Sequence, residues 1–162
     1  MVKRPTNIKL LLSRESVVKK ENTESPRLSP KEYRKILDNV QLDIISLDSC
    51  SAKVNQDKFG KQMKSTIKDK VSYNLLDENE VIFIQHYDFI STKTNQKEFA
   101  LKISCSFSAK FSSVEPLSDD FLEIFSKVNI HVNTWPYFRE FVQSITQRMS
   151  LPPVTLPLLK RG

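Results

Sequence analysis

The sequence predicts an α+β fold, in which a four-stranded antiparallel meander sheet carries a C-terminal helix and a proline-bearing loop on one side. Three observations lead to this class. Residues 40–54, 67–75, 81–90 and 99–111 have strand-like patterns, short turns separate the last three of them, and amphipathic helical segments follow. A chain of 162 residues is long enough for one domain.

The strand expected at residues 99–111 has the clearest period of two. From residue 101 onward its apolar side chains alternate with lysine and serine, so one face is apolar and the other polar. Residues 81–90 are almost continuously apolar, which predicts a strand buried on both faces or lying at an interface. Along residues 40–54 the apolar side chains change face at Ile45 and Leu47, which predicts a β-bulge.

Helix signals lie on both sides of the strands. Ser29 is suited to cap a short helix that begins at Pro30 and ends near residue 38. After the strands, Ser118 is placed to cap an amphipathic segment, and Pro136 is placed to start another. We therefore expect a broken C-terminal helix whose apolar stripes cover one face of the sheet.

The net charge of +6 is distributed unevenly along the chain. Residues 1–27 hold seven basic and three acidic residues, which leaves the remainder with a net charge of only +2. Basic segments with few apolar side chains are often solvated tails. We therefore predict a flexible basic arm at residues 1–28 and one folded domain at residues 29–162.

Sequence signals of catalysis and of cofactor binding are missing. Neither of the two glycines lies in a phosphate-binding loop, and His86 and His131 lack the spacing of a metal site. Cys50 and Cys105 have no Cys-x-x-Cys spacing, which favours two buried thiols in a reducing compartment. No apolar run approaches the ~18 residues that a membrane helix needs. The sequence thus predicts a non-enzymatic, cytoplasmic protein without a metal or other cofactor.

Two neighbouring segments carry a resemblance to a known family. Residues 135–140 have the sequence Trp-Pro-Tyr-Phe-Arg-Glu, and residues 149–158 have the sequence Met-Ser-Leu-Pro-Pro-Val-Thr-Leu-Pro-Leu. They resemble the SecB family of protein-export chaperones, whose members carry a comparable helix start followed by an apolar loop with prolines. The strands and helices come in the family's order, which extends the resemblance to most of residues 40–158.

The resemblance implies an ATP-independent chaperone, or holdase, that forms dimers and then homotetramers and binds unfolded polypeptides in apolar grooves. Holding a non-native chain requires apolar contact area rather than positioned acids or bases. We expect the groove between the helix that starts at Pro136 and the loop at residues 151–158. The expected client contacts are Trp135, Tyr137, Leu151, Val154, Leu156 and Leu158, with Phe107 and Phe111 on the sheet side.

This sequence departs from the SecB family in two features, and both concern the family's partner SecA. Familiar members are acidic, which helps them engage the motor ATPase SecA, whereas this chain is basic. Family members also continue into a further helix and a metal-binding tail, whereas this sequence ends at Gly162. We therefore do not expect delivery to SecA. A member with another client fits better, as in the SecB-like subgroup that serves a toxin–antitoxin pair.

Two other classes of function stay open at the level of sequence. A nucleic-acid-binding protein would use the basic arm for phosphates and Tyr73, Tyr87 or Trp135 for base stacking. The lysines are dispersed rather than interleaved with these aromatic residues, which counts against this alternative. A small apolar ligand is the other alternative, because an apolar groove does not identify its own ligand.

Overall fold

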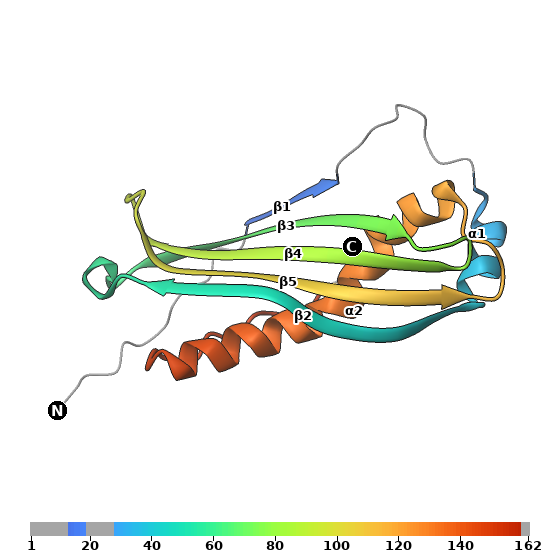
Figure 1. Cartoon of the computed structure of the whole chain (residues 1–162). Helices are drawn as coiled ribbons and strands as arrows, with labels where there is room; N and C mark the ends of the chain where they lie inside the picture. The colour runs from blue at the N-terminus through green and yellow to red at the C-terminus, as the bar shows by residue number, and fades with distance from the viewer. Residues whose placement is uncertain (1–12, 19–27, 160–162) are drawn as a thin grey trace.

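The computed structural model describes residues 28–159 and, by backbone alone, residues 13–18. One sheet contains β1 (Ser13–Val18), β2 (Val40–Val54), β3 (Met63–Leu75), β4 (Glu80–Lys93) and β5 (Phe99–Ser113). Helix α2 (Asp119–Arg148) crosses one face of this sheet, and α1 (Pro30–Leu37) lies beside its start (Figure 1). A short 3₁₀ helix, η1 (Gln56–Lys58), follows β2. The predicted α+β class, with a C-terminal helix on one side of the sheet, is confirmed.

The strand order is β1-β3-β4-β5-β2, which corrects the predicted connectivity at one point. Strands β3, β4 and β5 form the expected antiparallel meander. Strand β2 pairs with β5 and not with β3, so the meander does not extend to the first of the four antiparallel strands. Residues 55–62, which include η1, are long enough to cross the end of the sheet from β2 to β3, past β5 and β4.

Strand β1 was not predicted from the sequence. It pairs in parallel with β3 and occupies the edge of the sheet opposite to β2. Its residues fall within the predicted basic arm, most of which lies outside the described residues. The boundary at residue 28 therefore stays a prediction.

The predicted bulge in β2 is confirmed. The register of β2 against β5 shifts between Leu42 and Ile44, and again between Leu47 and Ser49. Between these shifts, Ile45 faces Ala109, a residue on the buried side of β5. The two shifts return Leu42, Ile45 and Leu47 to the side of the sheet that faces α2, although they do not follow a period of two.

Helix α1 begins as the sequence predicts. The Ser29 side chain accepts a hydrogen bond from the Glu32 N–H (3.3 Å), and the Glu32 carboxylate accepts one from the Ser29 N–H (2.9 Å). Hydrogen bonds from Ser29 lower the pKa of Glu32. Tyr33 stacks on Phe121 of α2 and donates its hydroxyl proton to Asn129 (2.6 Å). These two contacts fix α1 against the first half of α2, and burial raises the pKa of Tyr33 to about 12.

Helix α2 is a single helix of 30 residues, which corrects the expectation of two separate helices. Its start is capped by Ser118, as predicted. Pro136 lies inside the helix and removes one backbone donor, the one that would bond to Val132. Val132 is 42% exposed, so the missing hydrogen bond lies on a side of the helix that faces solvent. Trp135 and Phe138 on either side of the proline are buried, and this packing maintains the helix through Pro136.

Two apolar clusters lie between α2 and the sheet. In the first, Phe125 of α2 packs against Phe83 and Phe111, with ring centroids 5.4 and 5.0 Å apart. In the second, the Tyr87 ring stacks on Phe138 at 4.3 Å with an interplanar angle of 10°. Both clusters use the central strands β4 and β5, so the core follows the middle of the sheet.

Deleting residues 1–27 should leave a protein that still melts cooperatively, because both apolar clusters lie within residues 28–159. Calorimetry or circular dichroism on the shortened and full-length proteins measures this. Loss of the cooperative transition, or aggregation of the shortened protein, would show that the arm belongs to the folded domain.

Candidate functional site

The C-terminal loop, residues 150–159, folds back along one flank of α2. Three hydrogen bonds hold it there: Trp135 Nε1 to the Pro157 carbonyl (3.0 Å), Arg139 Nε to the Leu156 carbonyl (2.8 Å), and the Val154 N–H to Thr146 Oγ1 (3.2 Å). The Leu156 side chain is only 1% exposed and belongs to the second apolar cluster. The loop is thus packed against the helix along much of its length.

The eight predicted client contacts fall into three groups. Four are buried in the core: Trp135, Leu156, Phe107 and Phe111. Two pack partly buried against the core: Leu151 and Val154. Two are exposed, Tyr137 at 48% and Leu158 at 71%. The structure brings Trp135 and Leu156 together as expected, but as part of the core. Whether any of the eight contacts a client stays a prediction.

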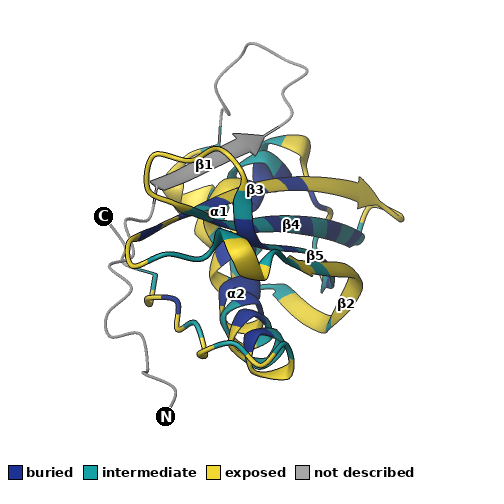
Figure 2. Cartoon of the chain, turned by 90° about the vertical axis from the view of Figure 1, so that its left-hand side faces the viewer, coloured by how far each residue is buried: buried dark blue, intermediate teal, exposed yellow. Residues whose placement is uncertain are grey.

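Strand β2 extends beyond the helix that covers the rest of the sheet. Helix α2 packs on β3, β4 and β5. Leu42 and Leu47 of β2 lie opposite the buried Phe111 and Phe107, on the same side of the sheet as α2. They nevertheless remain 36% and 45% exposed. Figure 2 shows β2 as a largely exposed strand beside α2.

Tyr137 completes an exposed apolar surface on this side of the helix. Its ring lies 6.2 Å from that of Phe107, the residue opposite Leu47. We define the β2–α2 surface as the exposed side chains Leu42, Leu47 and Tyr137, together with Phe107 and the half-buried Ile45, which lie on the side of the sheet that faces α2. Apolar side chains gathered on a surface in this way are typical of interaction sites.

The β2–α2 surface and the C-terminal loop lie on opposite flanks of α2. Trp135 and Arg139, which bind the loop, are each two residues from Tyr137. Two residues correspond to a rotation of about 200° around an α-helix, so Tyr137 points away from the loop. The β2–α2 surface therefore lies away from the predicted groove between the helix and the loop.

Sequence reasoning missed Leu42 and Leu47 as site residues. Their apolar character and the change of face near residue 45 were visible in the sequence. Their exposure depends on β2 lying at the sheet edge beyond α2, and no local pattern contains that information. The prediction of two buried thiols is wrong for one of them. Cys105 is buried, whereas Cys50 is exposed, because it also lies on β2 at the sheet edge.

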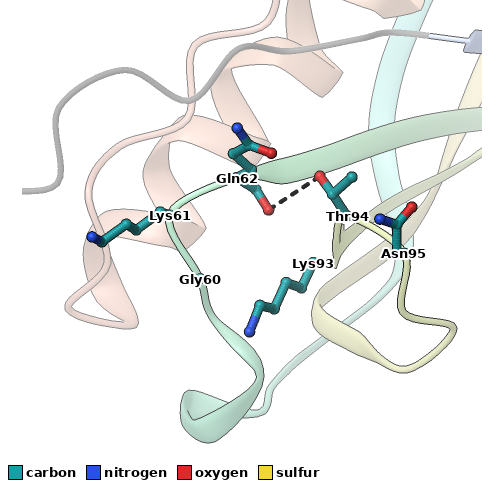
Figure 3. Close-up of a pocket in the computed structure, with 6 residues that line it drawn as sticks. All are labelled: Gly60, Lys61, Gln62, Lys93, Thr94 and Asn95. Carbon is teal, nitrogen blue, oxygen red and sulfur yellow. Dashed lines mark hydrogen bonds between the residues drawn. The ribbon is translucent and has the colours of Figure 1, made fainter.

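A different kind of surface lies at one end of the sheet, where the residues after η1 meet the β4–β5 turn (Figure 3). A pocket of about 580 Å³ is lined there by Gly60, Lys61, Gln62, Lys93, Thr94 and Asn95. Thr94 donates its backbone N–H to the Gln62 carbonyl (3.1 Å), which joins the two segments. A Cβ atom on Gly60 would lie 2.9 Å from carbon atoms of the flexible Lys93 side chain, which would have to shift to make room for it. Two ammonium groups and two amides suit an anionic group rather than an apolar one.

The buried polar groups connect α2 to the sheet. Asp69 accepts a hydrogen bond from the Gln85 amide (3.1 Å), and His131 Nδ1 lies 3.7 Å from the same carboxylate. The Tyr87 hydroxyl group lies 3.0 Å from His131 Nδ1 and 2.8 Å from Thr134 Oγ1. These side chains are all less than 10% exposed, so the network positions the helix from within the core.

Across residues 28–159, no group of three or more His, Cys, Asp or Glu side chains is placed to hold a metal ion. The helices in that range include none that is both long enough and apolar enough to cross a bilayer.

Comparison with known proteins identifies the fold. No family model matches the sequence, and no curated protein matches it. Among solved structures, a SecB-like chaperone of Mycobacterium tuberculosis, in complex with a ChAD peptide from the HigA1 antitoxin, matches with a TM-score of 0.67. The match has 18% identity and covers 78% of this chain and 94% of that chain. The chain has a SecB-like fold.

A protein of unknown function from Streptococcus agalactiae also matches, with a TM-score of 0.49 and 11% identity, over 74% of this chain and 97% of that chain. The SecB-like fold confirms the predicted sheet and its C-terminal helix. The β2–α2 surface is an exposed apolar feature that contacts the core through Tyr137 and Phe107.

Replacing Leu156 by Ala should destabilise the protein by about 2–4 kcal/mol, because a fully buried side chain leaves a cavity. The matched control, Leu158→Ala, should change the free energy of unfolding by less than about 0.5 kcal/mol, since Leu158 is 71% exposed. Urea denaturation of both variants gives the comparison. Equal, small effects would mean that the loop is not packed on α2.

Proposed function

We propose that this protein is an ATP-independent holdase that binds unfolded or non-native polypeptides through the β2–α2 surface. The observation that carries the proposal is the exposure of Leu42, Leu47 and Tyr137 beside the core of a SecB-like fold. A non-native chain exposes apolar side chains, and burying them against this surface contributes about 25 cal/mol per Å² of apolar area. Binding of this kind requires neither a nucleotide nor a catalytic group.

The backbone of β2 supports the same proposal. β2 is 15 residues long and lies at the sheet edge, with β5 as its neighbour on one side. Along its other side, an extended client segment can pair with the backbone while its alternate side chains meet Leu42 and Leu47. Backbone pairing does not depend on the client's side chains, which suits a protein that binds many sequences.

We further propose that the protein forms a homotetramer, built as a dimer of dimers. The face of the sheet opposite α2 supports self-association. On that face Ile44 lies opposite Lys110, which in turn lies opposite Ile82, and Ile84 follows on β4. Ile44 is 57% exposed. Several client surfaces on one assembly would make later contacts by the same long client intramolecular, which raises avidity.

A dedicated client fits the chain better than general export. The SecB-like chaperone of M. tuberculosis was solved with a peptide from an antitoxin, and we propose that clients of this chain include an antitoxin segment. The net charge of +6 differs from the acidic character associated with delivery to SecA. We place the protein in the cytoplasm, where its two free thiols are compatible with a reducing environment.

The alternative of nucleic-acid binding receives less support. Two of the three aromatic residues considered for base stacking, Tyr87 and Trp135, are 0% and 6% exposed. Their rings pack against one another and against Phe138, which leaves no face for a base. Tyr73 is 39% exposed but also packs on Phe83.

The purified protein should suppress aggregation of a chemically denatured enzyme on dilution, without ATP. The double variant Leu47→Ser, Tyr137→Ser should suppress it several-fold less per mole, because the apolar contact area is lost. Its melting temperature should change little, since both side chains are about half exposed. Light scattering during dilution measures the suppression.

Val114→Ser is the matched control, because Val114 is 81% exposed and lies after β5, outside the β2–α2 surface. It should suppress aggregation as the wild type does. If the double variant suppresses aggregation as well as the wild type does, the client site lies elsewhere. No suppression by the wild-type protein would remove the holdase proposal itself.

Multi-angle light scattering at micromolar concentration should give the mass of a tetramer. Ile82→Lys places a charge on the face opposite α2 and should lower this mass. A wild-type protein that elutes as a clean monomer would contradict the proposed assembly.

A further inference from the structure

The two cysteines of the chain are direct partners in the sheet. Cys50 of β2 lies opposite Cys105 of β5, and both thiols are free. The register is regular around them, since the neighbouring pairs are Ser49 with Ser106 and Ser51 with Ser104. Directly opposite residues of antiparallel strands project from the same face, with Cα atoms about 4.5 or 5.5 Å apart. A disulfide accommodates Cα separations of about 4.4–6.8 Å, so either spacing fits.

We propose that Cys50 and Cys105 form a reversible intramolecular disulfide through exchange with a low-molecular-weight disulfide such as glutathione disulfide. This modification site goes beyond the proposed holdase function and does not depend on it. The inference rests on the placement of the only two cysteines, 55 positions apart in sequence, at one register position.

The exposure of the two thiols determines the order of the steps. Cys50 is exposed on the edge strand and can meet a reagent from solution, whereas Cys105 is 1% exposed within the core. Burial raises the pKa of Cys105 to about 12, which keeps its thiol protonated and poorly reactive toward reagents in solution. Cys50 therefore reacts first, and Cys105 reacts with the adduct formed beside it.

The chemistry is a balanced pair of thiol–disulfide exchanges. The Cys50 thiolate attacks one sulfur of glutathione disulfide, which forms a mixed disulfide on Cys50 and releases one glutathione thiolate. The Cys105 thiol, held beside this adduct, then loses its proton and attacks the Cys50 sulfur, and the second glutathione leaves as a thiolate that takes up a proton. The two cysteines lose two protons and two electrons, and the oxidant becomes two molecules of glutathione.

The resulting bond would tie the edge strand to the rest of the sheet. Cys50 lies on the side of β2 that faces α2, the same side as Leu47 of the β2–α2 surface. The disulfide would close the chain segment between residues 50 and 105, which contains β3 and β4. Closing a long segment restricts the unfolded state, so oxidation should raise the melting temperature.

The test incubates the full-length protein with glutathione disulfide, removes the reagent, and then unfolds the protein in denaturant with iodoacetamide, so that every remaining thiol is blocked before the intact mass is measured. The wild-type protein should lose two hydrogens and carry neither glutathione nor alkyl groups. Cys105→Ser should instead retain one glutathione, because its mixed disulfide has no second thiol to displace it. Cys50→Ser should resist glutathionylation while folded, because its remaining thiol is buried.

Three outcomes would overturn the proposal. They are a wild-type protein that keeps glutathione on Cys50, one in which both thiols are alkylated after oxidation, and one that forms only disulfides between chains on a non-reducing gel. Peptide mapping of the oxidised protein checks that the internal bond joins Cys50 to Cys105. Reduction with dithiothreitol should restore two alkylatable thiols and reverse the rise in melting temperature.

Discussion

Helix α2 crosses the sheet at Tyr87, whose ring stacks on Phe138 at 4.3 Å while its hydroxyl group lies 2.8 Å from Thr134 Oγ1. The stacking and the polar contact of the Tyr87 side chain fix both the distance of the helix from the sheet and its position along β4. These two contacts span 47 and 51 positions in sequence, so they form only when sheet and helix are both in place. Because the helix follows the middle of the sheet, it covers β3, β4 and β5.

The exposure of β2 follows from this placement. A helix is about 10 Å wide, comparable to two strand spacings, and cannot cover a sheet of this width alone. The C-terminal loop fills the flank of α2 that carries Trp135 and Arg139. The opposite flank carries Tyr137, whose ring lies 6.2 Å from that of Phe107, the residue opposite Leu47 on β2. One packing choice therefore accounts for the buried loop, the exposed apolar surface and the accessible thiol of Cys50.

The sequence predicts those features of the fold that depend on local patterns. The alternation along residues 101–111 and the cap at Ser118 identify β5 and the start of α2, and the face change near Ile45 identifies the bulge. The neighbour of β2 could not be predicted, because pairing with β3 or with β5 satisfies the same alternation. Pro136 was expected to start a helix, and only the packing of its neighbours explains why the helix continues through it.

The site was less predictable than the fold, for a related reason. Leu156 and Leu158 are chemically alike and two positions apart, yet one is 1% and the other 71% exposed. Their difference arises from hydrogen bonds of the loop to Trp135 and Arg139, which connect segments about 20 positions apart. Which apolar side chains remain available to a partner is thus decided by tertiary contacts, and the same holds for Leu47 at the sheet edge.

Hydrogen–deuterium exchange with and without a saturating unfolded client tests the central claim most directly, because it locates the contact without altering the protein. We predict slower exchange along residues 41–48 of β2 and in the turn of α2 around Tyr137. The exchange rates of the C-terminal loop and of the pocket lined by residues 60–62 and 93–95 should be unchanged. Protection confined to that pocket or to the loop, with β2 unaffected, would contradict the account.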